Sequence, residues 1–336
     1  MGRSETGREP EVEQLTSVEI CAGAGGQASG LERAGFEHEL AVEIEPPAAA
    51  TLRLNRPQWN VFEGDVREVD GKAFRGIDLL AGGVPCPPFS VAGKQLGADD
   101  ERDLFPEAIR LVREAKPTAV MLENVKGLAS QRFAPYRSSI LQEFDALGYD
   151  ADWKLLESAS FGVPQLRPRF ILVAMKRRYF KKFSWGVRDG QTTTVGEALL
   201  PAMAAEGWSG AEAWSIRANR VAPTLVGGSK KHGGADLGPT RAKAAWLALG
   251  VNGKGIADEA PNIETPADHI PKLTLDMAAT VQGFSAEWKI SGRKTAAYRQ
   301  IGNAFPPPVA EAIGLRIRGA LHGRAESSVG KLEAAG

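Results

Sequence analysis

Residues 18–26, VEICAGAGG, read as an apolar strand that runs into a glycine-rich turn and then into a helix. Glycine lets the backbone approach a ligand closely, and open α/β sheets bind cofactors at the carboxyl ends of their strands. The turn by itself leaves two alternatives open, a tight strand-to-helix connection without a ligand and a dinucleotide site. This stretch therefore predicts an α/β fold with a candidate cofactor site at its first turn.

Short apolar runs separated by amphipathic segments continue this pattern, and they predict a mostly parallel α/β sheet of seven strands. The strands are expected at residues 17–22, 40–44, 59–62, 77–81, 119–123, 153–157 and 170–175. Helices are expected between them at residues 30–34, 48–55, 106–115 and 138–147. The prolines at 306–308 introduce a last helix, 309–321, which we expect to dock on the sheet.

The strand and helix pattern stops after Met175. From residue 176 to about 271 the chain is rich in Gly, Trp and Lys, has weak periodicity and holds four of the seven tryptophans. Between residues 176 and 243 it contains 12 Lys and Arg against 5 acidic residues, so positive charge collects there. We expect a catalytic and cofactor-binding domain at 1–178, a smaller irregular lobe at 179–271, and a return segment at 272–336 whose C-terminal helix packs on the first domain.

Bulk composition narrows the class of protein only slightly. The 336 residues include 41 Lys and Arg and 41 Asp and Glu, so the net charge neither requires nor excludes a nucleic-acid partner. Two cysteines far apart offer neither a disulfide framework nor a metal-ligand spacing, which favours a reducing compartment and no metal. The sequence has no signal-peptide core and no apolar run near 18 residues, so we expect a cytoplasmic protein without a membrane partner.

Two acidic residues follow the next expected strands and help to identify the cofactor. Glu43 ends the second strand, where its carboxylate can accept hydrogen bonds from two ribose hydroxyls, and Asp65 follows the third, where it can accept from an adenine amino group. A single nucleoside needs both acids but no pyrophosphate clamp, which favours S-adenosylmethionine over NAD. Each acid has an alternative interpretation as a helix cap or a solvated turn residue.

Residues 84–90, VPCPPFS, place Cys86 on a stiff, proline-rich loop directly after a buried strand. A thiol attacks only as the thiolate, so a nucleophilic cysteine needs a fixed pose and a partner that favours the anion. We interpret Cys86 as a candidate nucleophile. A buried cysteine that acts as a small apolar residue is the alternative.

Glu123 closes the fifth expected strand, two strand ends away from the cofactor turn and at the same edge as Cys86. A carboxylic acid there can protonate a ring nitrogen while a nucleophile adds to the ring. Arg167 and Arg169 are spaced to project on one side of the last strand, where they can hold a base carbonyl, a phosphate or Glu123 itself. An ordinary surface pair is the alternative for these arginines.

Taken together, these residues resemble the DNA cytosine-5 methyltransferases, whose motifs occur here in the family's order through nearly the whole chain. The matching segments are GAGG at 23–26, PC at 85–86, ENV at 123–125, QxRxR at 165–169, KLT at 272–274 with QGF at 282–284, and YRQIGNA at 298–304. The family usually carries Asp-Leu-Phe where this chain has Glu19, Ile20 and Cys21, so an aromatic contact near the adenine is absent.

The resemblance implies a Rossmann-like S-adenosylmethionine-dependent methyltransferase sheet with a target-recognition lobe. It implies methylation of C5 of a cytosine flipped out of a specific double-stranded DNA sequence. Cys86 would attack C6, Glu123 would protonate N3, and Arg169 would contact O2 with Arg167 in support. The resemblance also implies a monomeric modification enzyme of a restriction-modification system, with a cognate endonuclease that acts independently.

The resemblance also assigns binding residues. Those expected to bind the cofactor are Cys21, Ala22, Gly23, Gly25, Gly26, Glu43, Ile44, Asp65, Val66, Gly83, Pro85, Leu104, Asn303 and Ala304. Those expected to bind DNA are Ser90, Gln95, Arg220, Thr224, Lys230 and Lys231. The two lysines belong to a basic, glycine-flanked loop at 226–234, for which a solvated linker is the alternative.

Two alternative functions stay open at this point. One is a DNA-binding member of the family with impaired catalysis, which the intact Cys86, Glu123 and Arg169 disfavour. The other is the family's tRNA-acting branch, whose usual Cys-Phe-Thr signature this sequence lacks.

Overall fold

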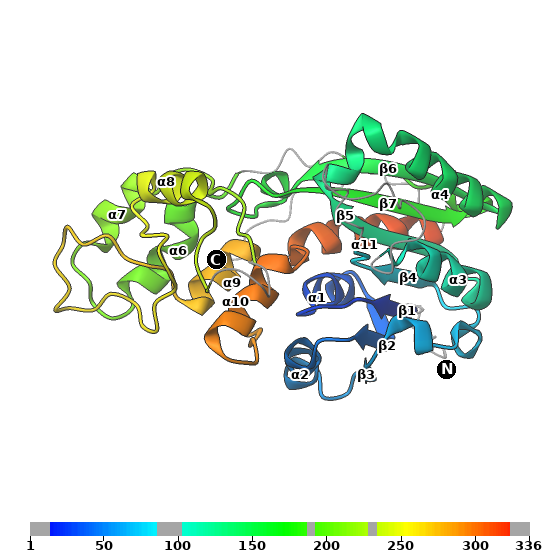
Figure 1. Ribbon diagram of the computed structural model, residues 1–336, viewed down its shortest axis with the longest axis horizontal. Coiled ribbons are helices and arrows are strands. Elements are labelled where there is room, and N and C mark those ends of the chain that lie inside the picture. The colour runs from blue at the N-terminus through cyan, green and yellow to red at the C-terminus, as the bar shows by residue number, and fades with distance from the viewer. Residues whose placement is uncertain (1–13, 86–102, 187–191, 228–233, 323–336) are drawn as a thin grey trace, which may run out of the picture.

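The computed structural model describes residues 14–85, 103–186, 192–227 and 234–322. Within these residues, seven strands form one sheet (Figure 1). The strands are β1 (Leu15–Ile20), β2 (Phe36–Glu43), β3 (Val61–Glu63), β4 (Leu79–Gly82), β5 (Ala119–Val125), β6 (Tyr149–Glu157) and β7 (Pro168–Lys176). The α/β sheet predicted from the sequence is confirmed.

The strand order is β3-β2-β1-β4-β5-β7-β6. The first five strands in this order pair in parallel, and β7 pairs antiparallel with both β5 and β6. Because β1 lies between β2 and β4, the strand order reverses direction at β1, and such switch points are where α/β sheets bind ligands. The carboxyl ends of β1, β2, β4 and β5 therefore lie together at one edge of the sheet.

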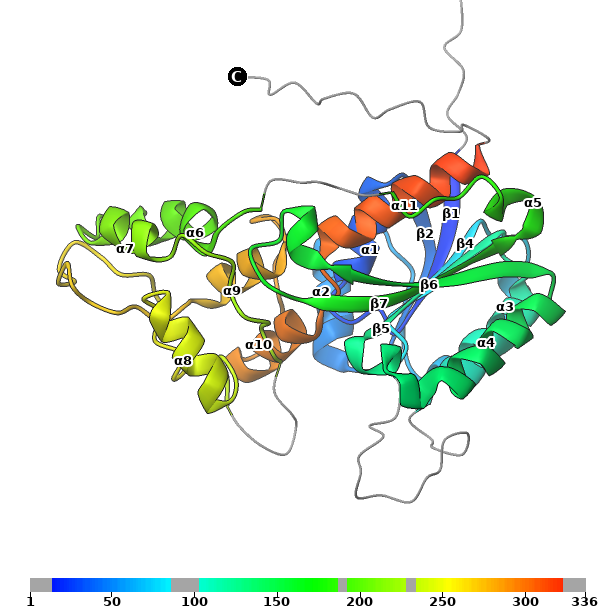
Figure 2. The same cartoon turned by 90° about the horizontal axis from the view of Figure 1, so that it is seen from above.

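Helices cover both faces of this sheet (Figure 2). They are α1 (Gly26–Arg33), α2 (Pro46–Asn55), α3 (Phe105–Ala115), α4 (Ala134–Ala146) and α11 (Pro307–Leu321). On one face, α1 and α11 pack together over a core that includes Leu31, Phe36 and Ile313. On the other face, α3 and α4 pack over a core that includes Val120 and Phe144. Short 3-10 helices occur in the connections at η1 (Val66–Glu68), η2 (Gly71–Phe74), η3 (Lys126–Ala129), η4 (Gln131–Phe133) and η5 (Ser158–Phe161).

The chain after β7 contains further helices, most of them in a lobe beside the sheet (Figure 1). They are α5 (Arg177–Phe180), α6 (Val195–Ala204), α7 (Ala211–Arg217), α8 (Thr240–Ala248), α9 (Leu275–Gln282) and α10 (Lys294–Asn303). The sequence predicted an irregular lobe, whereas α6, α7 and α8 are regular helices of 10, 7 and 9 residues. Helices this short show little periodicity. One local signal was present, because Thr194 and Glu197 form a capping box at the start of α6.

One continuous apolar core joins the lobe to the cofactor turn. It includes Trp214 and Trp246 in the lobe, Trp288 after α9, and Ala24 and Leu52 beside the sheet. In the part of the chain that the structure describes, no helix has the length and apolar character needed to cross a bilayer.

Candidate active site

The loop between β1 and α1 follows an unusual backbone path. Its φ angles are positive at Cys21 (53°), Gly23 (56°) and Gly25 (79°), a region that residues with side chains rarely adopt. The main-chain N–H of Gly23 donates to Oε2 of Glu43 at 2.7 Å. Glu43, the last residue of β2, thereby fixes the loop that follows β1.

A cavity of about 220 Å³ opens at this loop, between the carboxyl ends of β1 and β2 and helix α10. Its wall consists of Glu19, Cys21, Ala22, Gly23, Ala24, Gln27, Glu43, Glu45, Pro47, Ala48, Gly83, Glu123, Ala296, Arg299, Gln300, Asn303, Ala304 and Phe305. The cavity lies at the switch point of the sheet, where the sequence predicted the cofactor site.

The polar side chains of this cavity fit S-adenosylmethionine. Glu19 is fully buried and Gln27 is 3% exposed, yet none of their side-chain polar atoms has a hydrogen-bond partner among the described residues. Burial raises the pKa of Glu19 well above its usual range, although the main-chain N–H of Ala28 opposes part of the rise, and a nearby cation would favour the carboxylate form. A methionyl group carries both an ammonium for such a carboxylate and a carboxylate for an amide N–H. Each oxygen of Glu43 accepts one main-chain N–H and keeps a second lone pair for a ribose hydroxyl.

Half of the residues predicted to bind the cofactor line this cavity: Cys21, Ala22, Gly23, Glu43, Gly83, Asn303 and Ala304. The other half do not line it: Gly25, Gly26, Ile44, Asp65, Val66, Pro85 and Leu104. The structure gives several of these residues other contacts.

Asp65 forms the cap that the sequence left open as its alternative role. Its carboxylate accepts the main-chain N–H of Arg67 at 2.9 Å and pairs with the Arg67 guanidinium at 2.9 Å. The Arg67 main-chain N–H, assisted by the Arg67 side chain, lowers the pKa of Asp65. Val66 is buried in the core beneath α3, and Ile44 is 59% exposed.

Gly25 and Gly26 face other parts of the protein. A Cβ atom on Gly25 would lie 2.6 Å from the Trp288 ring, and one on Gly26 would lie 2.2 Å from the carbonyl oxygen of Phe305. These two glycines therefore permit close packing of the loop against the C-terminal part of the chain.

A second cavity, of about 670 Å³, shares a wall with the first. Gly83, Glu123 and Asn303 line both cavities, whereas Arg169 and Thr224 line only the second. A ligand in one cavity would therefore meet a ligand in the other across the end of β5.

Glu123 lies in the shared wall and is paired with Arg169. Oε1 of Glu123 is 2.6 Å from Nε of Arg169, and the two side chains are 13% and 10% exposed. Burial raises the pKa of Glu123, while the positive charges of Arg169 and Arg167 counteract part of the rise. A carboxyl group with a raised pKa beside a cavity is suited to donate a proton.

Arg167 has a different environment from Arg169, although the sequence assigned both to catalysis. Its guanidinium donates to three main-chain carbonyls, of Leu225 at 2.7 Å, Gly302 at 2.7 Å and Ala304 at 3.0 Å. The side chain thus ties the start of β7 to the lobe and to the end of α10. Arg167 therefore stabilises the wall of the second cavity, whereas the guanidinium of Arg169 pairs with Glu123.

Cys86, Ser90, Gln95, Lys230 and Lys231 lie outside the described residues. Pro85, the last described residue before Cys86, lines the second cavity. Asn124 Nδ2 donates to the carbonyl of Val84 at 2.8 Å, and the N–H of Leu104 donates to the carbonyl of Pro85 at 3.4 Å. Pro85 and Leu104, on either side of the undescribed residues 86–102, are therefore joined beside the second cavity.

Two predicted DNA-binding residues can be placed. Thr224 lines the second cavity, and its hydroxyl donates to the carbonyl of Leu166. Arg220 is exposed on the lobe and does not line either cavity.

The sequence interpretation missed several residues of the first cavity. Glu19 and Gln27 flank the glycine-rich turn, and Arg299 and Gln300 lie in the YRQIGNA segment. Their position inside or next to the family motifs could have indicated that these residues line the cofactor cavity.

Comparison with known proteins identifies the class to which this fold and site belong. The family model for C-5 cytosine-specific DNA methylases matches residues 15–319. The chain is 58% identical over 318 residues to the type II methyltransferase M.NaeI of Lentzea aerocolonigenes, which covers 93% of this chain and 76% of that protein. It is 54% identical over 312 residues to the type II methyltransferase M.NgoMIV of Neisseria gonorrhoeae, covering 92% of this chain and 98% of that protein.

Solved structures agree on the fold. A crystal structure described as a putative DNA modification methyltransferase encoded within an E. coli prophage superimposes with a TM-score of 0.65 at 23% identity, covering 92% of this chain and 99% of that one. The site and fold thus define a DNA cytosine-5 methyltransferase. The chain belongs to the C-5 cytosine-specific DNA methylase family, as its motifs predicted.

Proposed function

We propose that this enzyme methylates C5 of a cytosine that is flipped out of double-stranded DNA into the second cavity. The observation that carries the proposal is the position of Glu123, which is paired with Arg169 in the wall shared by the two cavities. A base in the second cavity would meet the proton donor, and C5 would face the first cavity across that wall. Flipping costs a few kcal/mol of lost stacking and pairing, which phosphate contacts of a basic lobe offset.

In this proposal the thiolate of Cys86 attacks C6 of the cytosine. A carbon–sulfur bond forms at C6, and the electron pair of the C5–C6 double bond shifts to form a C4–C5 double bond. The electron pair of the C4–N3 double bond moves to N3, which takes the proton of Glu123. Arg169 holds O2 and then neutralises the Glu123 carboxylate. C5 then takes the methyl group, which would leave the sulfonium of the cofactor as a neutral thioether. The C5 proton leaves to solvent, the bond between C6 and the Cys86 sulfur breaks to release the thiolate, and N3 returns its proton to Glu123.

We place S-adenosylmethionine in the first cavity, where it supplies an electrophilic methyl group on a sulfonium. The fit of the polar groups supports this placement. Glu43 would hold the ribose hydroxyls, and Glu19 and Gln27 would hold the methionyl ammonium and carboxylate. Asn303 and Gly83, which line both cavities, would separate the two ligands while leaving a path for the methyl group.

We further propose a division of labour along the chain: a catalytic domain at 1–178, a target-recognition domain at 179–271 and a return segment at 272–336. The concentration of Lys and Arg between residues 176 and 243 supports DNA reading by the lobe. The names of the two relatives support a role as the modification enzyme of a type II restriction-modification system. The enzyme would act as a cytoplasmic monomer, and a cognate endonuclease would act independently.

Bisulfite sequencing of the genome of a bacterial host that expresses this chain tests the proposal. Methylated cytosines should occur at one fixed position of one short sequence, and a Glu123→Gln variant should leave that sequence unmodified. A host genome without new methylation, or modification of tRNA alone, would contradict the proposed substrate.

A further inference from the structure

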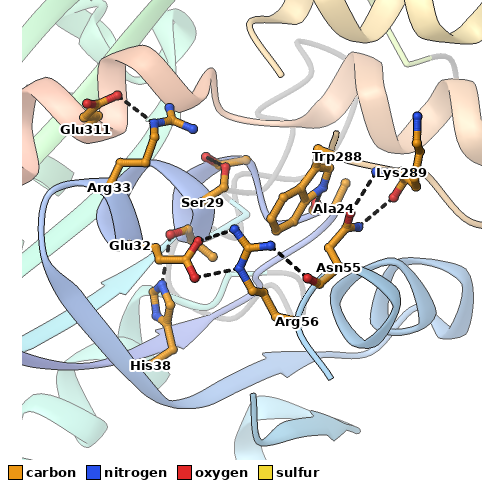
Figure 3. A network of polar contacts seen from close by, with 12 residues as sticks. Ala24, Ser29, Glu32, Arg33, His38, Asn55, Arg56, Trp288, Lys289 and Glu311 are labelled. Carbon is orange, nitrogen blue, oxygen red and sulfur yellow. Dashed lines mark hydrogen bonds and ion pairs between the residues drawn. The ribbon is translucent and has the colours of Figure 1, made fainter. Parts of the chain in front are cut away.

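Trp288 contacts the cofactor loop from outside the cavity. It follows α9, is 6% exposed, and its indole N–H donates to the carbonyl oxygen of Ala24 at 2.9 Å. Ala24 lines the cofactor cavity, whereas Trp288 does not. The hydrogen bond joins two residues that are 264 positions apart in the chain (Figure 3).

The ring of Trp288 also fixes the loop by close packing. Because a Cβ on Gly25 would lie 2.6 Å from the ring, only glycine lets the loop approach the indole this closely. Gly25 also has a φ of 79°, a conformation that a residue with a side chain rarely adopts. The loop conformation and the position of the ring therefore depend on each other.

A network of polar contacts holds Trp288 in place (Figure 3). The Arg56 guanidinium lies 5.2 Å from the centroid of the Trp288 ring, within range of a cation–π interaction. Glu32 of α1 accepts two hydrogen bonds from Arg56, both at 2.6 Å. At the end of α2, Asn55 Nδ2 donates to the carbonyl oxygen of Lys289 at 2.7 Å. Asn55 Oδ1 accepts a hydrogen bond from the main-chain N–H of Lys289 at 2.8 Å. Trp288 is thus tied to the two helices that flank the cofactor loop.

We propose that Trp288 is a positioning residue for cofactor binding, which presets the loop 22–26 in its binding conformation; this inference rests on the proposed cofactor site. A loop with three glycines in four positions has many backbone conformations, and ordering it on binding would cost affinity. Trp288 orders the loop before the cofactor binds, through its hydrogen bond to the Ala24 carbonyl and the packing of its ring against Gly25. The return segment therefore completes the cofactor site from the far end of the chain.

Two matched substitutions test this role in the full-length protein. Trp288→Phe keeps an aromatic ring but removes the indole N–H. Trp208→Phe removes a similar bond, since Trp208 is 3% exposed and its N–H donates to the carbonyl of Pro266 at 2.9 Å in the lobe. Both variants should lower the melting temperature by similar amounts.

Isothermal titration with S-adenosylmethionine then separates the two variants. Trp288→Phe should weaken binding roughly two- to tenfold, the effect of one lost hydrogen bond, and Trp208→Phe should leave binding unchanged. Arg56→Ala should weaken binding in the same direction, although Arg56 does not line the cavity. In steady-state assays, KM for the cofactor should rise for Trp288→Phe while kcat at saturating cofactor is retained.

The outcomes distinguish this inference from the proposed function. Equal affinities for Trp288→Phe and Trp208→Phe, with tight binding by the unmodified protein, would overturn the positioning role alone. Failure of the unmodified protein to bind S-adenosylmethionine would overturn the proposed cofactor site and this inference together.

Discussion

Arg169 and Glu123 form an ion pair with 2.6 Å between Nε and Oε1, at the point where β7 runs antiparallel to β5. The pair lies at the carboxyl end of β5, so it brings a buried acid and its counter-charge to the edge where the parallel strands also end. An isolated buried carboxylate would be costly, and the guanidinium reduces that cost without removing the acid from the cavity wall.

Cys86→Ser should abolish methyl transfer while specific DNA binding is largely kept. A hydroxyl is similar in size to a thiol but far less nucleophilic at neutral pH. Transfer from tritium-labelled cofactor to DNA measures the effect, and a filter-binding assay monitors DNA affinity. Substantial residual turnover would remove Cys86 from the mechanism.

The second cysteine serves as an internal control for thiol reactivity. Burial, with smaller effects from the charges of Glu43 and Asp65, raises the pKa of Cys21 to about 12. In the Cys86→Ser protein, iodoacetamide should therefore label Cys21 only slowly at pH near 8, because the thiolate fraction is very small. Fast labelling that levels off near pH 8.5 would contradict the raised pKa of the Cys21 thiol.

Glu123→Gln should lower the single-turnover rate by on the order of 10²–10⁴, because a positioned acid contributes about that much. The amide cannot deliver a proton to N3 but preserves the shape of the wall. Cofactor affinity should change little in calorimetry. A collapse of cofactor affinity with intact single-turnover chemistry would instead place Glu123 in the cofactor site.

Glu43→Ala and Asp65→Ala should both weaken S-adenosylmethionine binding without changing which DNA sequence is modified. Glu43→Ala should cost about 1–3 kcal/mol, because it removes an acceptor to the ribose and the anchor of Gly23. Asp65→Ala should cost less, since its carboxylate is engaged by Arg67 outside the cavity. Glu63→Ala is the control, because Glu63 ends β3 but pairs with Arg53 away from the cavity. Unchanged affinity in both test variants would show that neither acid contributes to cofactor binding.

Cofactor binding should release a proton from Glu19. Burial raises the pKa of Glu19, so the free protein holds this carboxyl protonated below the raised value. A bound ammonium favours the carboxylate and lowers the pKa again, so the proton leaves on binding and affinity increases as the pH rises towards the raised pKa of the free protein. Titrations in two buffers with different ionisation enthalpies count the released protons. If Glu19→Gln behaved like the unmodified protein in both buffers, Glu19 would have no part in ammonium binding.

Replacing both Lys230 and Lys231 with alanine should weaken binding to cognate and non-cognate DNA alike. Two adjacent lysines with glycines on both sides in the sequence suit phosphate contact better than base reading. The slope of log affinity against log salt should decrease by roughly two, one unit for each lost phosphate contact. A loss confined to cognate DNA would assign the lysines to sequence reading, and no loss at all would favour a solvated linker.

Local sequence patterns determined much of the fold and part of the site. Apolar runs and turn residues predicted each strand, and parallel strands end at a common edge. The sequence alone therefore placed Glu43 and Glu123 near one cofactor turn. The lobe was harder to predict, because its short helices depend on burial of residues such as Trp246 in a core shared with distant segments.

Tertiary structure alone decided the different roles of residues with similar local patterns. Arg167 and Arg169 are two positions apart on one side of a strand, yet one meets the carbonyls of Leu225 and Gly302 and the other meets Glu123. Likewise, the glycine-rich turn could be recognised in the sequence, but its contact with Trp288 could not. Hydrogen-bond partners that are more than 200 residues apart are set by packing of the whole chain, whereas strands and turns are set by neighbouring residues.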